Sequence, residues 1–276
     1  MFDMLTNSLI FKPPPKQESR LFRKDSKNVL LSTVTSCHIH CHLVCPFDQD
    51  TNIHDFKKTK TLLIFFHGNA EDVHTSASYC QWLADSTKSN LLTCDYPGYG
   101  FSTGCSSESA MNDAAMTLLD FATSNLQHEM DEIIIVGKSL GSTPAIFTAS
   151  QPVCYDLGGL VLIAPIASAV RCLSASKNFP NFILERLDTL LLPNIARIKD
   201  VCCPIQFIHG LEDNVVPVCN TRALLQALHS PCMTKPLFLN CSHNDIECRF
   251  KSEFINTLET FIDKCQQRSL SKTVYN

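Results

Sequence analysis

The feature that most constrains the fold of this chain is a series of short runs in which nearly every residue is apolar. Two of these runs are Leu62–Phe66 and Ile133–Val136. A strand with one face in water alternates apolar and polar residues, whereas a strand covered on both faces is apolar throughout. The runs therefore predict strands of a parallel sheet that is covered by helices on both faces.

Similar runs recur along the chain, with helical patterns between them. Strands are expected near residues 29–45 and at Thr61–Phe66, Leu91–Asp95, Glu132–Val136, Gly159–Ala164, Ile205–His209 and Pro236–Asn240. Helices are expected near residues 71–87, 108–128, 140–150, 218–229 and 245–265, where apolar residues recur at helical spacing. This alternation predicts an α/β fold with a mostly parallel, doubly wound sheet.

The domain organisation follows from where this alternation starts and stops. Pro13, Pro14 and Pro15 forbid helix and favour extended structure, so we expect residues 1–28 to form an extended N-terminal arm. No linker or internal repeat interrupts the pattern after that point. We therefore expect a single domain over residues 29–276, with a short lid-like insertion over residues 164–201.

Charge and composition narrow the classes of function. The chain has 23 Lys and Arg against 27 Asp and Glu, and this balance argues against a nucleic-acid partner. The N-terminal residues lack the basic region and cleavage site of a signal peptide, and no apolar run is long enough to span a membrane. We accordingly expect a cytoplasmic monomer whose 15 cysteines are reduced thiols.

The segment from Cys37 to Cys45 raises the question of a metal site. His38, His40 and His42 alternate with apolar residues at a period of two, which predicts a half-buried strand with its histidines on the polar face. The histidines could bind zinc together, but no CxxC or HExxH spacing accompanies them. We expect no metal and no cofactor.

The strongest chemical signal is the segment Gly137–Gly141, which reads G-K-S-L-G and lies between an apolar strand and a helical pattern. In this context G-x-S-x-G predicts a nucleophile elbow: a tight turn that exposes Ser139, flanked by glycines because larger side chains would clash. The alternative is the end of a phosphate-binding P-loop. Glu132 would then replace the first glycine of the loop and repel phosphate.

A serine nucleophile needs a base and a residue that orients the base. In hydrolases with this elbow the chain order is serine, acid, histidine. Asp213 follows the strand Ile205–His209, and His243 follows the last strand. We predict that Ser139, Asp213 and His243 form a catalytic triad, with Glu212 as the other candidate for the acid.

An acyl-transfer site also needs donors for the oxyanion of the tetrahedral intermediate. The backbone N–H of Leu140, directly after the nucleophile, is expected to be one donor. The second should come from the loop His67-Gly68-Asn69-Ala70, with the N–H of Asn69 preferred and that of Ala70 as the alternative. His67 could serve as a second base, but a structural role in the loop is the preferred interpretation.

With these residues in view, the sequence resembles the α/β-hydrolase superfamily, and more closely the α/β-hydrolase-domain-17 family of protein depalmitoylases. The matching segments are Leu9–Pro15, Phe66–Asp72, Asp95–Gly100, Gly137–Pro144, His209–Asp213 and His243–Glu247. The resemblance implies the α/β-hydrolase fold and cleavage of thioester-linked palmitate from membrane-attached proteins. It also implies peripheral association with the cytoplasmic face of membranes, which family members achieve through an N-terminal cluster of palmitoylated cysteines; the first cysteine here is Cys37.

The substrate is expected to be an acylated protein or a lipid-like acyl compound. Phe179, Phe182 and Leu191 in the lid-like insertion are candidates to contact an acyl chain, although they could equally be ordinary core residues. A carboxylesterase or a serine aminopeptidase-like hydrolase is the alternative, and the peptidase would use Glu185 or Asp188 to anchor a free amine. A non-catalytic scaffold would usually lack a triad residue, and none is missing here.

Overall fold

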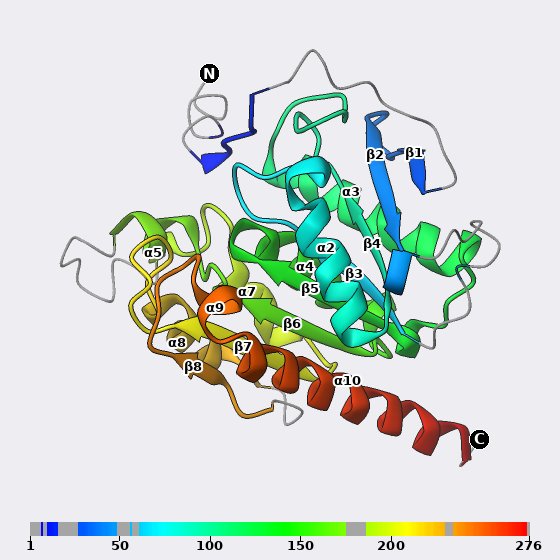
Figure 1. The fold of residues 1–276 in the computed structure, drawn as a ribbon. Coiled ribbons are helices and arrows are strands. Elements are labelled where there is room, and N and C mark those ends of the chain that lie inside the picture. The colour runs from blue at the N-terminus through cyan, green and yellow to red at the C-terminus, as the bar shows by residue number, and fades with distance from the viewer. Residues whose placement is uncertain are drawn as a thin grey trace.

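A central eight-stranded sheet organises the computed structural model, which describes residues 7, 10–15, 27–48, 56, 61–174, 186–229 and 234–274 (Figure 1). The strand order is β1-β2-β4-β3-β5-β6-β7-β8. The strands are β1 Asn28–Ser32, β2 His38–Val44, β3 Leu62–Phe66, β4 Asn90–Cys94, β5 Ile133–Lys138, β6 Gly159–Ile163, β7 Ile205–Gly210 and β8 Leu237–Leu239. Only β1–β2 and β2–β4 among these pair antiparallel, so the mostly parallel sheet predicted from the apolar runs is confirmed.

Helices cover both faces of this sheet, as predicted. They are α2 Val73–Thr87, α3 Glu108–Asp120, α4 Ser142–Ala149, α5 Ala169–Ser174, α7 Asn194–Arg197, α8 Cys219–Ala227, α9 Ile246–Arg249 and α10 Lys251–Val274. In β3, Leu63 and Phe65 pack in a core cluster with residues of α2 and α10. Leu62 and Ile64 point the other way, into a cluster with residues of α3, α4 and α8. Because the strand is buried on both faces, its consecutive residues are all apolar.

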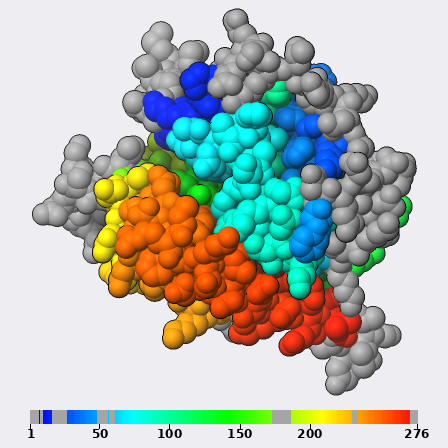
Figure 2. All heavy atoms as spheres, in the orientation of Figure 1, coloured from blue at the N-terminus to red at the C-terminus, as the bar shows by residue number. Residues whose placement is uncertain are grey.

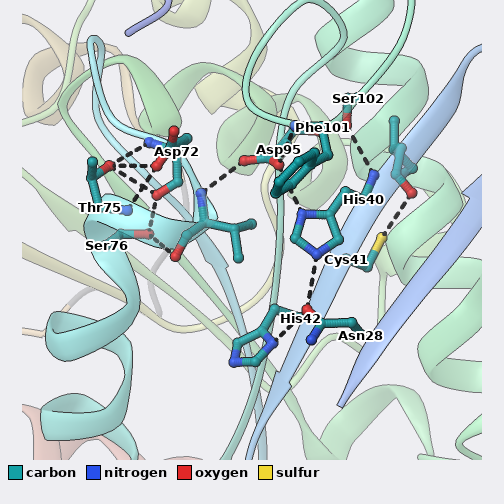
Figure 3. Close-up of polar contacts among 12 residues, drawn as sticks. Asn28, His40, Cys41, His42, Asp72, Thr75, Ser76, Asp95, Phe101 and Ser102 are labelled. Carbon is teal, nitrogen blue, oxygen red and sulfur yellow. Dashed lines mark hydrogen bonds and ion pairs between the residues drawn. The ribbon is translucent and has the colours of Figure 1, made fainter. Parts of the chain in front are cut away.

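The region near residues 29–45 forms a hairpin of two strands. The turn between them uses Ser36 in a left-handed conformation with φ 63°, and Leu30 pairs with His40 across the ladder. His38 is exposed and His42 is half-buried, but His40 is buried, contrary to the expectation of a uniformly polar face. Its ring bridges Asp95 and Asn28, with Nδ1 2.8 Å from Asp95 Oδ2 and Nε2 2.9 Å from Asn28 Oδ1 (Figure 3).

The C-terminal helical pattern is interrupted where the sequence predicts continuity over residues 245–265. Helix α9 ends at Arg249, the next residue Phe250 has a non-helical φ of −121° and ψ of 40°, and α10 then begins at Lys251. After the break, Phe254, Leu258 and Phe261 of α10 pack in the core cluster on one face of the sheet. No helix in the described ranges is long and apolar enough to cross a membrane.

Candidate active site

Ser139 lies at the end of β5, on a strained turn. It begins a single 3-10 turn, Ser139–Gly141, that runs directly into α4. Its φ is 52°, in the left-handed region that side chains rarely adopt. Strain of this kind costs on the order of 1–3 kcal/mol and concentrates at functional sites. The local geometry is that of the nucleophile elbow predicted from the sequence.

The glycines on either side of Ser139 are required by packing. A Cβ on Gly137 would lie 2.7 Å from the Cβ of Ala145 in α4. A Cβ on Gly141 would clash with the carbonyl oxygen of Phe66 and lie 2.7 Å from that of His67. These close approaches bring the loop after β3 directly against the turn that carries Ser139.

The structure brings Ser139, His243 and Asp213 together, although they are far apart in the sequence. His243 follows β8, and its Nε2 lies 3.2 Å from Ser139 Oγ. Its Nδ1 lies 2.6 Å from Oδ2 of Asp213, which follows β7. Glu212, the other candidate acid, is exposed, so the carboxylate that faces His243 is that of Asp213.

The carboxylate of Asp213 is held by several donors. Its Oδ1 accepts hydrogen bonds from the backbone N–H groups of Val215 at 2.9 Å and Val216 at 2.8 Å. Burial raises the pKa of Asp213, but the hydrogen bonds from His209 and His243 outweigh burial and hold the pKa well below its ordinary value. Asp213 is therefore ionised at neutral pH, which favours the His243 tautomer with its proton on Nδ1 and leaves Nε2 free to accept the proton of Ser139.

His209 supports this carboxylate and was not singled out by the sequence reasoning. It is fully buried at the end of β7, with Nε2 3.3 Å from Asp213 Oδ2 and 2.8 Å from the carbonyl oxygen of Val216. Its Nδ1 lies 2.6 Å from the hydroxyl of Thr221 in α8. The signal in the sequence is a histidine near the end of a mostly apolar strand, four residues before Asp213.

Comparison with known proteins agrees with this architecture. No family model matches the chain. It is 29% identical over 214 residues to the α/β-hydrolase domain-containing protein aho-3 of Caenorhabditis elegans, covering 77% of this chain and 60% of that protein. It is 30% identical over 204 residues to α/β-hydrolase domain-containing protein 17C of Mus musculus, covering 72% and 59%. This chain thus aligns with less than two thirds of the length of these relatives.

Solved structures carry the same fold at lower sequence identity. The Pyrococcus furiosus esterase Pf2001 superposes with a TM-score of 0.70 at 15% identity, covering 92% of this chain and 97% of the esterase. The α/β-hydrolase domain-containing protein 10 from mouse gives a TM-score of 0.60 at 16% identity, covering 86% and 98%. This chain is an α/β-hydrolase-fold protein. Its sequence resembles the domain-17 members of that fold.

In this α/β-hydrolase-fold protein, the loop after β3 contains both candidates for the second oxyanion donor, Asn69 and Ala70. The N–H of Ala70 lies 3.2 Å from Asn69 Oδ1, so the alternative donor is already engaged. No partner for the N–H of Asn69 lies within the described ranges. Leu140 is in the first turn of its helix, where N–H groups have no partner within the helix. The geometry thus favours Asn69 over Ala70 as the second donor.

His67 serves the loop rather than the triad. Its ring is fully buried, and its centroid lies 4.2 Å from that of Tyr96. Its Nδ1 lies 2.9 Å from the carbonyl oxygen of Gly68, so Nδ1 carries the proton that is donated. Among the described residues His67 has no hydrogen bond to Ser139 or His243, which agrees with the structural role preferred for it.

The predicted substrate contacts are only partly covered by the structure. Phe179, Phe182 and Glu185 lie outside the described residues. Leu191 is half-buried and packs against the main core cluster. Asp188, the candidate amine anchor in a peptidase, is buried and forms an ion pair with Arg171 at 2.7 Å, so its negative charge is already paired. Among the described residues, no group of three or more His, Cys, Asp and Glu side chains is placed to hold a metal.

Proposed function

We propose that this protein is a serine hydrolase that acts on acyl thioesters and esters through an acyl-enzyme, with S-palmitoyl proteins as its substrates. The observation that carries the proposal is the continuous hydrogen-bonded chain from Ser139 through His243 to Asp213, which begins at a strained residue. Such a chain supplies a nucleophile, a base and an orienting carboxylate in one place.

The reaction follows from the positions of these groups. His243 Nε2 takes the proton of Ser139 as Oγ attacks the acyl carbonyl carbon, and the N–H groups of Asn69 and Leu140 bind the oxyanion. The intermediate collapses to the acyl-serine as the protonated His243 donates its proton to the departing sulfur or oxygen. Water, activated by the same imidazole, then attacks the acyl-serine, releases the fatty acid and restores Ser139.

Two exposed apolar side chains in the loop that carries Asp213 support an apolar acyl substrate. Leu211 and Val215 flank Asp213 in its loop and are 39% and 56% exposed. Each methylene transferred from water to an apolar environment is worth about 0.8 kcal/mol, so exposed apolar residues of this type favour a long acyl chain. We place the protein at the cytoplasmic face of membranes, as a monomer bound peripherally to reach acylated proteins. The resemblance to the domain-17 family supports this placement.

The first test is labelling with a fluorophosphonate, which forms a covalent bond with activated serines. We expect the wild-type protein to be labelled and the Ser139→Ala variant to remain unlabelled. Folded wild-type protein that resists the probe would refute the proposed hydrolase.

A second test identifies the substrate class. We would compare kcat/KM for a long-chain acyl thioester, a short-chain ester and an amino-acid amide. The proposal expects the long-chain thioester to be the best substrate. A preference for the short ester would indicate a carboxylesterase, and a preference for the amide would indicate an aminopeptidase-like enzyme.

A further inference from the structure

The side chain of Asn69 fastens the N-terminal segment to the loop beside the nucleophile. Its Nδ2 donates to the carbonyl oxygen of Ile10 at 2.7 Å, and its Oδ1 accepts from the backbone N–H of Lys12 at 2.8 Å. The amide thus makes the paired donor and acceptor contacts that a neighbouring strand would make with residues on either side of Phe11. Phe11 itself is 4% exposed and belongs to the main core cluster.

The same oxygen accepts two more hydrogen bonds. Asn69 Oδ1 accepts from the hydroxyl of Tyr99 at 2.9 Å and from the N–H of Ala70 at 3.2 Å. Burial raises the pKa of the Tyr99 hydroxyl, which therefore remains protonated and able to donate. One side-chain amide consequently joins the N-terminal segment, the loop after β3 and the turn after β4. In Figure 2 the dark-blue N-terminal segment lies directly against the cyan atoms of this region.

The loop held in this way lies next to the reacting serine. Phe66 pairs with Gly137 in the sheet, so residues beyond Phe66 lie beside residues beyond Gly137. The loop is also strained, because Ala70 has a φ of 59°. Strained backbone keeps its conformation only where surrounding contacts determine it. The contacts of the Asn69 amide are among those that hold this backbone.

We propose that Asn69 is a positioning residue whose side chain, by binding Ile10 and Lys12, holds its own backbone N–H in the oxyanion hole. The N-terminal segment is then a structural part of the active site. This inference rests on the proposed serine hydrolase, because a misplaced oxyanion donor has consequences only if Ser139 is acylated.

The test uses full-length variants and two readouts, hydrolysis of a p-nitrophenyl ester and the rate of fluorophosphonate labelling. Losing one oxyanion donor lowers kcat by roughly 10²–10³-fold, so displacing it in Asn69→Ala should lower kcat by at least ~10-fold. KM should change little, because this donor acts mainly on the transition state. A variant whose KM rises while kcat is unchanged would show instead that Asn69 shapes substrate binding, and would overturn the proposal.

The N-terminal side of the contact is tested without altering Asn69. Lys12→Pro removes the N–H that Asn69 Oδ1 accepts, whereas Lys12→Ala retains it, so kcat should be at least ~10-fold lower for the proline variant than for the alanine variant. Phe11→Ala weakens the same docking by a different route and should lower kcat in the same direction. Pro15→Ala, at an exposed position outside this contact, is the control and should match the wild type.

The outcomes separate this inference from the proposed function. Wild-type protein that fluorophosphonate does not label refutes the hydrolase itself. The positioning role alone is refuted if the wild type is labelled but Lys12→Pro and Lys12→Ala have equal kcat. This comparison is made at a temperature where both variants are folded. The double variant Asn69→Ala with Lys12→Pro should lose no more activity than Asn69→Ala alone, since both changes break one link; additive losses would also refute it.

Discussion

A largely buried ion pair joins the strand that precedes Ser139 to the helix that follows His243, and removing this pair should have a measurable effect on stability. Lys138 immediately precedes Ser139, and its Nζ lies 3.2 Å from Glu247 Oε1 in α9. The same ammonium lies 4.8 Å from the centroid of the Tyr79 ring, and the Tyr79 hydroxyl donates to Glu247 Oε1 at 3.2 Å. The Lys138 and Glu247 side chains are only 13% and 8% exposed.

The expected cost follows from this burial. Removing one partner of a buried pair costs roughly 3–5 kcal/mol, because the other charge is left uncompensated, whereas neutralising both partners is often nearly neutral. Some water still reaches this pair, so we expect Lys138→Met and Glu247→Gln each to lower the free energy of unfolding by about 2–3 kcal/mol. The double variant should lie within about 1 kcal/mol of the wild type.

Urea unfolding of the four proteins at neutral pH measures these values. The coupling energy between the two substitutions should then be at least about 3 kcal/mol, well above the roughly 0.5 kcal/mol within which independent sites are additive. A double variant whose loss equals the sum of the two single losses would show that the pair does not interact as the structure describes. Lys264→Met, an exposed lysine of α10, controls for the effect of removing a positive charge.

Three further predictions follow from the same structure. Gly141→Ala should destabilise the fold by about 1–3 kcal/mol and abolish fluorophosphonate labelling, because the new Cβ would clash with the carbonyl oxygens of Phe66 and His67. An unchanged melting temperature and unchanged labelling would contradict this packing. The pKa of Asp213 is lower in the folded state than its unfolded-state value of about 4. The ionised carboxylate therefore stabilises the fold at pH values above the unfolded-state pKa, and this stabilisation is lost as the pH falls through the folded-state pKa. The difference in unfolding free energy between wild type and Asp213→Asn should therefore shrink from pH 6 to pH 2, and a constant difference would argue against it. Burial raises the pKa of Cys154 to about 11 and the pKa values of Cys80 and Cys265 to about 12. Iodoacetamide at pH 8 should therefore modify the exposed cysteines and leave these three unmodified until the protein unfolds, which peptide mapping would measure.

Much of the fold and the order of the site residues could be predicted from the chain alone. Runs such as Ile133–Val136 encode a strand covered on both faces, because periodicity reports the burial of each residue directly. The ends of parallel strands meet at one edge of a sheet, so motifs that follow separate strands must converge. This reasoning placed Ser139, Asp213 and His243 at three strand ends, and the structure joins them by hydrogen bonds.

Which distant side chains become partners depends on how the folded chain packs. Periodicity assigned His40 to a polar face, but Asp95 and Asn28 satisfy both its ring nitrogens and allow it to be buried. Likewise the sequence motif predicts a role for the backbone N–H of Asn69. The hydrogen bonds of its side-chain amide to Ile10 and Lys12 are visible only in the folded chain.

Backbone conformation depends on nearby residues, whereas the partners of a buried side chain depend on residues far away in the sequence. Local sequence fixes backbone conformation and the alternation of buried positions, since these depend on neighbours within a few residues. Hydrogen bonds such as those between Asp213 and His243 and between Glu247 and Tyr79 depend on the packing of elements that lie 30 and 168 residues apart in the chain. The pattern of residues therefore predicts the sheet and the side chains at its edge, and the packing of the elements selects the groups that hold those side chains in place.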